Sequence, residues 1–480
     1  MRHSASLIRR CAFRFGLAAA VSLFVWPAAA AQQSSAASSA LSPATSSSPA
    51  AASSPAAAIA NGRWTGGLDF GQGREDFSLR ILPEGGLFDL PGQRLYGYPL
   101  SAIRREGAHI EFALFAGKAS GSPSKETGNA LIFSGELGVG PEGAPRIAGS
   151  ISRSGVVNGT FDLEPAPAAA EPGESSYSLD TGRGILPGTL LVPAGPGPFP
   201  VVLILAGAGT TDRDGNNYSV PGKNDALKQL AEALRERGVA SLRYDKRGSG
   251  EAYYLVAKEE DLRFDDYVKD AAAALAALRA DRRFSRLVIA GHTEGALVAA
   301  AALAEPGAPA VDGLALLCAS GKSAVETVGA AVAGAPSSLK AEGEAIMAAL
   351  RAGKTYPHPS PYFADFFRPS FQPYLASWFK YDLLSELKVD KAPLLLVQGN
   401  RDFQTTLAEF DLLVRDRPDA AAYVIPDMNH ALKVVGPDLN DNYRAFTDPS
   451  FPLAPQLADI LAAFAAGRPL PDPKFRYTPK

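Results

Sequence analysis

The apolar and polar positions of this chain follow two different patterns, one in each half. Between residues 61 and 165, short apolar runs such as DFSLRIL, HIEFALFAG and ALIFSGELG are separated by Gly, Pro and polar turns. Runs of this length and spacing are typical of antiparallel strands. We therefore expect residues 61–165 to form a small all-β domain, an antiparallel sheet that is open or partly closed into a barrel.

From residue 177 to residue 470, strand-like and helix-like patterns alternate. Continuous apolar runs such as FPVVLILAGAG and APLLLVQGN lie between amphipathic segments such as NDALKQLAEALRERG. Strands that are apolar throughout and separated by helices predict a mostly parallel sheet with helices on both faces. The expected fold class of this region is α/β.

An insertion from about residue 321 to 387 interrupts this alternation. Ten aromatic residues fall within the 26 residues Tyr356–Tyr381, a density that suggests an apolar surface beside the sheet. We interpret the insertion as a lid or a substrate-binding wall, with Trp378 and Phe379 as substrate-binding residues. The alternative is that it covers an edge of the sheet.

Four other segments carry no core-forming pattern: residues 1–31, 32–60, 166–176 and 471–480. The first has arginines, then the apolar stretch GLAAAVSLFVW, then small residues, which is the pattern of a secretory signal peptide. We expect export to the periplasm or the medium; an uncleaved anchor is the alternative. The second segment is rich in Ala, Ser and Pro, and the third is rich in Pro, Ala and Glu. We expect both segments to be linkers. The last is a tail.

The charge and cysteine content exclude several classes of function. The net charge is −3, so no basic field for nucleic acid is expected. Cys11 lies in the expected signal peptide, which leaves Cys318 as the one thiol of the mature chain. We expect Cys318 to be a packed apolar side chain, and we expect no disulfide, no metal and no cofactor.

The stretch LVIAGHTEGALVAA contains the strongest chemical motif. An apolar strand ends in a tight corner with Gly291 and Gly295 on either side of Thr293, and a small-residue helix follows. A nucleophile elbow of a hydrolase needs this arrangement, because the small residues let strand and helix approach while the central side chain points out. Thr293 is therefore the predicted nucleophile.

A nucleophilic hydroxyl needs a base, and the base needs an acid that orients it. The chain has five histidines, and His430 follows the last predicted strand, where such sheets deliver their base. Asp402 follows the preceding buried strand. The order Thr293, Asp402, His430 is that of an α/β-hydrolase triad. For the oxyanion hole we expect the backbone N–H groups of Glu294, after the nucleophile, and Ala208, in a glycine-rich turn after an early strand.

Other charged motifs are expected to be structural. Asp245, Lys246 and Arg247 lie at the end of a strand, where charges usually pair with each other or with loops. Asp212 and Asp214 lack the spaced ligands of a calcium loop, so we expect them to stabilise a turn. His109 lies on a strand of the β-domain, where we expect a structural or exposed side chain.

Taken together, GAGTTDRDGNN, LRYDKRGSG, GHTEG, VQGNRDFQTT and MNHALK resemble a bacterial group of exported α/β-hydrolases called serine aminopeptidase-like or esterase-like, related to the prolyl-oligopeptidase hydrolase domain. The resemblance covers about residues 175–467. It implies a catalytic acid at Asp402, a base at His430 and an oxyanion donor at Glu294. The usual elbow is Gly-His-Ser-Glu-Gly, so Thr293 matches the nucleophile in position and not in identity. The start of the β-domain, GRWTGGLDF, is similar to that of family members.

Threonine at this position leaves three hypotheses open. The first is a hydrolase of ester, amide or peptide bonds, slower than a serine enzyme because a β-branched residue suits a positive φ poorly. The second is a hydrolase-fold protein with weak or no activity that binds an ester- or peptide-like small molecule. The third is an interaction protein of the cell envelope that acts through its β-domain.

Overall fold

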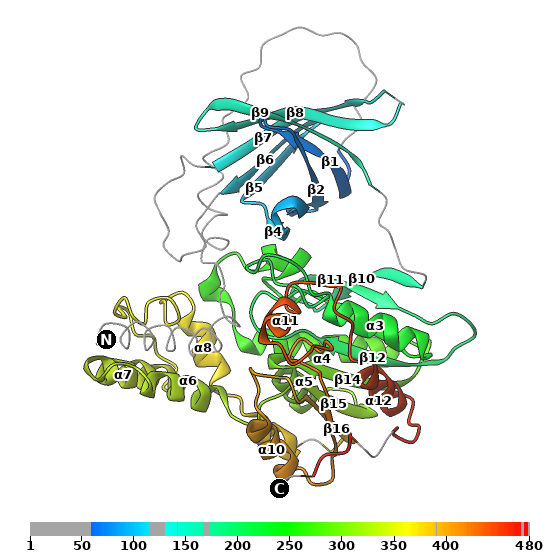
Figure 1. Ribbon diagram of the computed structural model, residues 1–480, viewed down its shortest axis with the longest axis vertical. Helices are drawn as coiled ribbons and strands as arrows, with labels where there is room; N and C mark the ends of the chain where they lie inside the picture. The colour runs from blue at the N-terminus through cyan, green and yellow to red at the C-terminus, as the bar shows by residue number, and fades with distance from the viewer. Residues whose placement is uncertain are drawn as a thin grey trace.

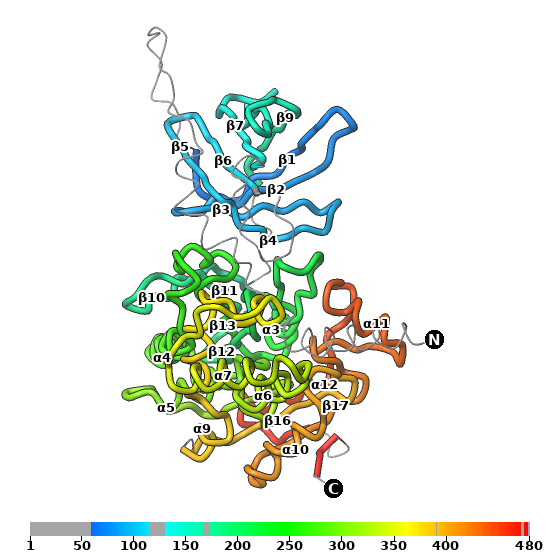
Figure 2. The backbone as a smooth tube through the Cα atoms, turned by 90° about the vertical axis from the view of Figure 1, so that its left-hand side faces the viewer, coloured from blue at the N-terminus to red at the C-terminus, as the bar shows by residue number. Residues whose placement is uncertain are grey.

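The computed structural model describes residues 59–115, 130–141, 143–166, 173–389, 391–471 and 475–478. The predicted signal peptide and nearly all of the predicted linker before the β-domain lie outside these residues. The described chain forms an antiparallel β-domain and a larger α/β domain, which are drawn one above the other in Figure 1 and remain distinct in the view of Figure 2. Within the described residues, no helix combines the length and the apolar character that a membrane span requires.

The β-domain is a single nine-stranded sheet with the strand order β4-β3-β2-β1-β9-β8-β7-β6-β5. Its edge strands β4 and β5 are consecutive in the chain, and the residues between them join the two edges: Leu100 N–H donates to Gly86 O, and Ser101 N–H donates to Ala113 O, both at 2.9 Å. The sheet is therefore strongly curved, as Figure 2 shows. The strands are β1 (Gly62–Asp69), β2 (Arg74–Leu82), β3 (Gly85–Leu90), β4 (Leu95–Pro99), β5 (Ala102–Glu106), β6 (His109–Phe115), β7 (Ala130–Val139), β8 (Pro145–Arg153) and β9 (Val156–Pro165).

Aromatic rings fill the concave side of this sheet. Phe112 and Phe133 stack with their ring centroids 4.5 Å apart, and Phe161 meets both rings edge-on. The alternation of apolar and polar residues along each strand places these rings on one face and polar residues on the other.

The α/β domain contains an eight-stranded sheet with the order β10-β11-β13-β12-β14-β15-β16-β17. The six strands from β13 to β17 are parallel, whereas β10 and β11 run antiparallel at one edge. The strand β10 begins inside the predicted linker 166–176, and its exposed polar residues reflect its position at the sheet edge. The strands are β10 (Glu174–Asp180), β11 (Ile185–Leu191), β12 (Phe199–Leu205), β13 (Ala240–Tyr244), β14 (Phe284–His292), β15 (Gly313–Leu317), β16 (Leu394–Gly399) and β17 (Ala421–Ile425).

Helices cover both faces of this sheet, as the apolar strands predict. Along β12, Leu203 packs under α4 and α5, and the next residue, Ile204, packs under α3 and α12 on the opposite face. The helices are α3 (Ala226–Glu236), α4 (Phe264–Ala280), α5 (Glu294–Ala304), α6 (Ala324–Ala333), α7 (Lys340–Arg351), α8 (Gln372–Trp378), α9 (Leu383–Val389), α10 (Leu407–Asp416), α11 (Leu439–Arg444) and α12 (Pro455–Ala465), with 3-10 turns η4 (Gly250–Leu255) and η5 (Glu259–Asp261).

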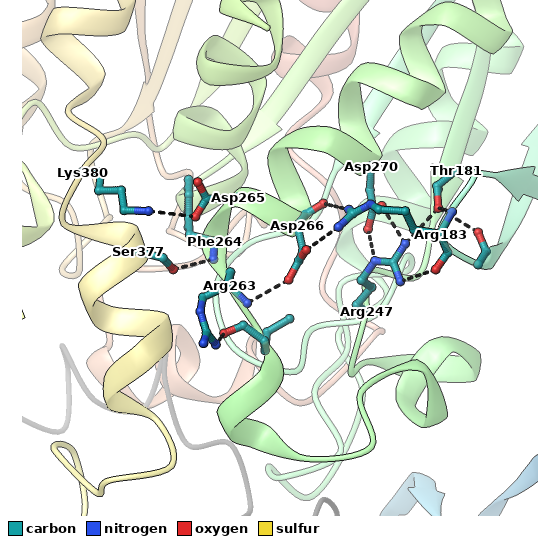
Figure 3. A network of polar contacts seen from close by, with 12 residues as sticks. Thr181, Arg183, Arg247, Arg263, Phe264, Asp265, Asp266, Asp270, Ser377 and Lys380 are labelled. Atoms are coloured by element: carbon teal, nitrogen blue, oxygen red, sulfur yellow. Dashed lines mark hydrogen bonds and ion pairs between the residues drawn. The ribbon is translucent and has the colours of Figure 1, made fainter. Parts of the chain in front are cut away.

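The aromatic insertion supplies helices α6 to α9 and packs on α4 and α5. Its rings Phe363, Phe367 and Phe371 are buried in the same apolar cluster as the inner face of α4. At the N-terminus of α4, the backbone N–H of Phe264 donates to Ser377 Oγ at 2.8 Å, and Lys380 pairs with Asp265. Figure 3 shows these contacts of Ser377 in α8, and of Lys380 just after α8, with the start of α4. The insertion therefore extends the hydrophobic core on this side of the molecule.

The β-domain contacts the α/β domain through β2, β3 and β4. Arg80 forms an ion pair with Glu251 of η4, and Gly86 N–H donates to the hydroxyl of Tyr253 at 3.1 Å. Arg94, just before β4, forms hydrogen bonds with two loops of the α/β domain. Its carbonyl accepts from Gly222 N–H at 2.7 Å, and its guanidinium donates to a backbone carbonyl at residue 447 at 2.6 Å.

Candidate active site

Thr293 lies at the sharp turn between β14 and α5. Its backbone has φ 53° and ψ −112°, a conformation that L-residues with branched side chains rarely adopt. Two backbone bonds hold the turn: Thr293 N–H donates to Leu317 O, and Ala296 N–H donates to Thr293 O, both at 3.0 Å. The conformation is therefore fixed by the strand beside it and by the first turn of the helix.

Gly291 and Gly295 are required by the close approach of strand and helix. A Cβ on Gly291 would lie 2.2 Å from Gly295 O, and a Cβ on Gly295 would lie 2.7 Å from the carbonyls of Leu205 and Ala206. No side chain fits at either position without moving the backbone. The two glycines that the sequence singled out thus permit the geometry of an elbow.

Asp402 and His430 lie at the ends of neighbouring strands, β16 and β17, and form a hydrogen bond. His430 Nδ1–H donates to Asp402 Oδ2 at 2.8 Å, and both side chains are buried. The other oxygen, Asp402 Oδ1, accepts from the backbone N–H groups of Gln404 and Thr405, each at 2.8 Å. These bonds fix the carboxylate, and the carboxylate favours the tautomer of His430 with its proton on Nδ1, in which Nε2 is the acceptor.

The hydroxyl of Thr293 and Nε2 of His430 both lack hydrogen-bond partners within the described part of the chain. Both residues line the same cavity. The hydroxyl lies against the turn after β12, because a Cβ built on Gly207 would be only 2.6 Å from Thr293 Oγ1. The structure thus brings the predicted nucleophile, base and acid to one place, with the hydroxyl not yet bonded to the base.

The turn after β12 and the start of α5 provide two backbone N–H groups, those of Ala208 and Glu294. Ala208 lines the same cavity as Thr293, and Glu294 is the first residue of α5, where the N–H has no partner within the helix. The helix N-terminus also favours negative charge. Ala208 and Glu294 therefore remain the candidates for an oxyanion hole, one beside the cavity and one at the helix N-terminus that follows Thr293.

His292, the residue before Thr293, has a role in the site that was not predicted from the sequence. Its Nε2–H donates to the backbone carbonyl of His430 at 2.8 Å, so it joins the elbow to the loop that carries the base. Burial lowers the pKa of His292 to about 3, and the nearby ring of His430 adds to the shift. His292 is therefore neutral at ordinary pH. The sequence feature that could have indicated this role is the position of His292 inside the elbow motif.

Cys318 also lies beside Asp402 and His430. Its sulfur, a carboxylate oxygen of Asp402 and a ring nitrogen of His430 are all within 4.8 Å of one another. Burial raises the pKa of the Cys318 thiol well above its usual value, with a further contribution from the Asp402 carboxylate. The thiol therefore stays protonated, and it is buried, as the sequence predicted, against a polar neighbour that the sequence did not reveal.

The cavity beside Thr293 and His430 has a volume of about 520 Å³. Its aromatic side chains are Phe403, Tyr443 and Phe446, with Asn216 and other residues of the loop 211–224 on another side. The structure places Trp378 and Phe379 elsewhere: both pack against the hydrophobic core, and neither is among the residues that line this cavity. The insertion buries most of its aromatic rings against α4 and α5, so it covers these helices rather than the edge of the sheet that was the alternative.

The charged motif at the end of β13 divides into two kinds of residue. Asp245 accepts from the backbone N–H groups of Arg213 and Glu251, each at 2.8 Å, and Arg247 forms a two-bond pair with Asp270 of α4. Figure 3 shows Arg247 held between Asp270 and Thr181. These two are structural, as predicted. Lys246 also pairs with a loop and a carboxylate, as predicted, but its partners are Gly207, in the turn after β12, and Glu294, the residue after Thr293.

A family model and a sequence relative both agree with the hydrolase group that the sequence resembles. A model of the family described as serine aminopeptidase, S33, matches residues 223–350, a span that contains the elbow. The esterase EstD of Thermotoga maritima is 26% identical over 296 residues, which is 59% of this chain and 68% of that protein.

Two solved structures show more distant likeness. Est1E of Butyrivibrio proteoclasticus is 18% identical with a TM-score of 0.35, over 53% of this chain and 90% of that chain. A proline iminopeptidase of Mycobacterium smegmatis is 17% identical with a TM-score of 0.38, over 61% of this chain and 98% of that chain. With TM-scores and identities this low, the two structures add nothing to what the family match and the sequence relative show.

Proposed function

Since the chain is an α/β-hydrolase of the serine aminopeptidase and esterase type, we propose that it cleaves ester bonds with Thr293 as the nucleophile. His430 acts as the base, and Asp402 orients it. The observation that carries the proposal is the 2.8 Å bond from His430 Nδ1 to Asp402, beside a buried hydroxyl and a buried ring nitrogen that both lack partners among the described residues.

In the first half of the reaction, His430 Nε2 takes the proton of Thr293 while Oγ1 attacks the ester carbonyl carbon. The carbonyl oxygen becomes an oxyanion, which accepts hydrogen bonds from the N–H groups of Ala208 and Glu294. When the tetrahedral intermediate collapses, His430 returns the proton to the leaving alcohol. An acyl group remains on Thr293 Oγ1.

In the second half, a water molecule attacks the acyl carbon and gives its proton to His430 Nε2. Collapse of the second intermediate breaks the bond to Thr293 Oγ1, and His430 returns the proton to that oxygen. The products are a carboxylic acid and the free enzyme. No step requires a metal or an organic cofactor.

The methyl group of Thr293 is the main obstacle to this reaction. Oγ1 lies against Gly207, so it must rotate about χ1 to bond with His430 and attack a substrate. The backbone strain at a non-glycine residue in such a conformation is about 1–3 kcal/mol, and a β-branched side chain has few χ1 rotamers. Turnover slower than that of a serine enzyme follows.

The cavity favours substrates with an apolar acyl or alkyl group. Phe403, Tyr443 and Phe446 supply an aromatic surface next to the triad, while the loop 211–224 supplies amide side chains opposite it. Sites for small molecules are commonly apolar pockets with few polar groups of fixed position. The sequence relative EstD is an esterase by name, which supports ester rather than peptide substrates.

A second candidate is a binding protein of the same fold with little or no activity. The observation that favours it is that Thr293 Oγ1 makes no hydrogen bond to His430 in the described chain. Such a protein would hold an ester- or peptide-like molecule in the cavity without turning it over.

Hydrolysis of p-nitrophenyl butyrate separates the two candidates. We expect slow turnover by the intact protein and its loss in His430→Ala. The matched control is His109→Ala, because His109 pairs with Glu136 in the β-domain, outside the triad, and should leave turnover unchanged. Absence of turnover in the intact protein, with turnover appearing in Thr293→Ser, would favour the binding protein.

We also propose that the enzyme acts outside the cytoplasm. The arginine-rich start and the apolar stretch GLAAAVSLFVW support export. Expression in a bacterial host followed by fractionation tests this, with the mature protein expected in the periplasm or medium. Accumulation of the full-length chain in the cytoplasm or membrane would contradict it.

A further inference from the structure

The ammonium group of Lys246 lies buried between the two parts of the oxyanion hole. Lys246 Nζ donates to the backbone carbonyl of Gly207 and lies 3.2 Å from Glu294 Oε1. Gly207 belongs to the turn after β12, and Glu294 is the first residue of α5. One side chain therefore bonds to both segments that carry the predicted oxyanion donors.

We propose that Lys246 is a positioning residue that aligns the oxyanion hole through the carbonyl of Gly207. This inference rests on the proposed function, because it concerns the same donors. It goes beyond that function by assigning a role to a residue that does not itself contact the substrate.

The geometry of one peptide bond links Lys246 to the N–H of Ala208. The carbonyl of Gly207 and the N–H of Ala208 belong to the same peptide unit, and in a trans peptide these two groups point in opposite directions. A bond from Lys246 to the carbonyl therefore aims the N–H of Ala208 away from the lysine. Thr293 Oγ1 lies against Gly207 at this turn, and Ala208 and Thr293 line one cavity.

The charge of Lys246 strengthens the same N–H as a donor. A hydrogen bond from a cation is stronger than one from a neutral donor, and bonds in series polarise each other in a medium of low dielectric constant. An ammonium on the carbonyl of Gly207 therefore makes the N–H of the following residue a better donor to an oxyanion.

The surroundings of Lys246 hold it in this position. Glu294 Oε2 accepts from the hydroxyl of Tyr374 at 2.8 Å, and Lys246 Nζ lies 5.0 Å from the centre of the Tyr267 ring. Burial raises the pKa of Tyr374 well above its usual value, and Glu294 adds to the shift, so the phenol remains a donor. The side chains of Lys246 and Glu294 are 9% and 3% exposed, which leaves little room for another arrangement.

A purely structural role would require only the pair between Lys246 and Glu294. Two variants separate the roles, both made in the Thr293→Ser background so that turnover is measurable. Lys246→Met removes the bond to Gly207 and leaves Glu294 without its cation. Lys246→Met/Glu294→Gln removes the bond to Gly207 but also removes the unpaired negative charge, and the backbone N–H of residue 294 is retained.

We expect Lys246→Met to lower kcat by about 10- to 100-fold, within the range for losing an oxyanion donor, with KM changed less than about threefold because substrate binding in the ground state does not use the oxyanion contacts. The double variant should recover the melting temperature but not kcat. Recovery of both together would overturn the proposal and leave Lys246 as a charge partner of Glu294.

Arg247→Met is the matched control. Arg247 is the next residue and also forms a buried ion pair, with Asp270, but it has no contact with Gly207 or Glu294 among the bonds of the structure. We expect it to lower the melting temperature and to leave kcat within about twofold of its parent, since the bond that aims the Ala208 N–H is intact. An equal loss of kcat in both variants would show that any buried charge defect on this loop impairs turnover, which would overturn the specific role of Lys246.

Binding of benzoate tests the site independently of a competent nucleophile. In Thr293→Ala, the carboxylate should occupy the oxyanion hole, and adding Lys246→Met should weaken binding at least fivefold in a titration followed by NMR. This result would stand even if the proposed hydrolysis failed. Unchanged affinity, or no binding of benzoate to Thr293→Ala, would overturn the positioning role of Lys246.

Discussion

His292 donates a hydrogen bond from Nε2 to the backbone carbonyl of His430, and the two atoms are 2.8 Å apart. The ring centroids of the two histidines are 5.3 Å apart. Since a carbonyl can only accept, His292 must carry its proton on Nε2, and its other ring nitrogen is bare. One histidine therefore fixes the backbone of the other, and a second proton on His292 would place a charge beside the base.

The first prediction concerns stability at acid pH. Burial lowers the pKa of His292 from 6.5 to about 3. Between pH 3 and pH 6.5, His292 therefore binds a proton in the unfolded chain but not in the folded chain. The stability that this group contributes is complete above pH 6.5 and is lost as the pH falls toward 3, by up to about 1.4 kcal/mol per pH unit. Urea unfolding of the intact protein and of His292→Gln between pH 4 and 7.5 measures it.

The comparison of the two proteins isolates this group from other buried acids. His292→Gln keeps a donor for the carbonyl of His430 and removes the titration. The free energy of unfolding should therefore fall less steeply with acid in the variant. Parallel curves for both proteins would show that His292 does not carry the pH dependence.

The second prediction is that Thr293→Ser raises kcat. Removing the methyl group relieves the strain of a β-branched residue at φ 53° and frees rotation of the hydroxyl from Gly207 toward His430. If about 1.4–2.8 kcal/mol of misfit is removed from the transition state, kcat rises about 10- to 100-fold. Steady-state hydrolysis of p-nitrophenyl butyrate at pH 7.5 measures the change.

Thr293→Ala is the control for this substitution, because it relieves most of the same crowding without supplying a hydroxyl. It should have no turnover above background. A serine variant with kcat equal to or below that of the intact protein would contradict our account of the elbow. It would indicate that the site is adapted to threonine.

The sequence predicted which candidate catalytic side chains lie together better than it predicted the lining of the cavity, for a physical reason. Parallel strands end at the same edge of their sheet, so residues just after β14, β16 and β17 must gather there even though Thr293 and Asp402 are far apart in the chain. The elbow glycines are likewise local, because each clashes with backbone within a few residues or in the next strand.

Contacts made by long side chains could not be predicted in this way. Lys246 reaches Gly207 across 39 positions, and nothing in the sequence separates it from Asp245 and Arg247, which make structural contacts. The density of aromatic residues led us to expect Trp378 in a binding wall, although aromatic rings also pack in a hydrophobic core. The rings that line the cavity, such as Phe403, stand in ordinary loops without such a signal.

The third prediction separates these two roles of aromatic residues. Phe403 lines the cavity and is 36% exposed, and its ring centroid lies 5.0 Å from that of Tyr443, with the two rings tilted by 50°. Phe403→Ala should raise KM for p-nitrophenyl butyrate by about 5- to 20-fold, which corresponds to about 1–2 kcal/mol of lost apolar contact. Its melting temperature should change little, because the side chain is partly solvated already.

Trp378→Ala is the matched aromatic deletion away from the cavity, since Trp378 is partly buried and packs against the hydrophobic core. It should lower the free energy of unfolding by about 2–4 kcal/mol, as for other large-to-small changes among packed side chains, with KM unchanged. Chemical denaturation and steady-state kinetics on both variants give the comparison. If Trp378→Ala raised KM as much as Phe403→Ala, the insertion would be part of the binding wall after all.

The fourth prediction concerns how the β-domain supports the cavity. The guanidinium of Arg94 donates to the carbonyl of Thr447 at 2.6 Å, and its own carbonyl accepts from Gly222 N–H at 2.7 Å. Thr447 and Gly222 both line the cavity. The β-domain thus bonds to two loops that form the cavity wall, although it lies outside the α/β domain in which the triad is built.

Arg94→Ala removes the bond to Thr447 and keeps the backbone bond to Gly222. An exposed hydrogen bond of this kind is worth about 0.5–1 kcal/mol, so we expect KM to rise about two- to fivefold while kcat stays within about twofold. We expect KM to change more than kcat because losing this bond loosens the cavity wall at Thr447. Thr293, Asp402 and His430 are held by β14, β16 and β17 and do not move. Arg104→Ala is the control, since Arg104 pairs with Glu106 on the edge strand β5. Equal KM values for Arg94→Ala and Arg104→Ala would mean that the cavity keeps its shape without the β-domain contact, and that the domain serves some purpose other than supporting substrate binding.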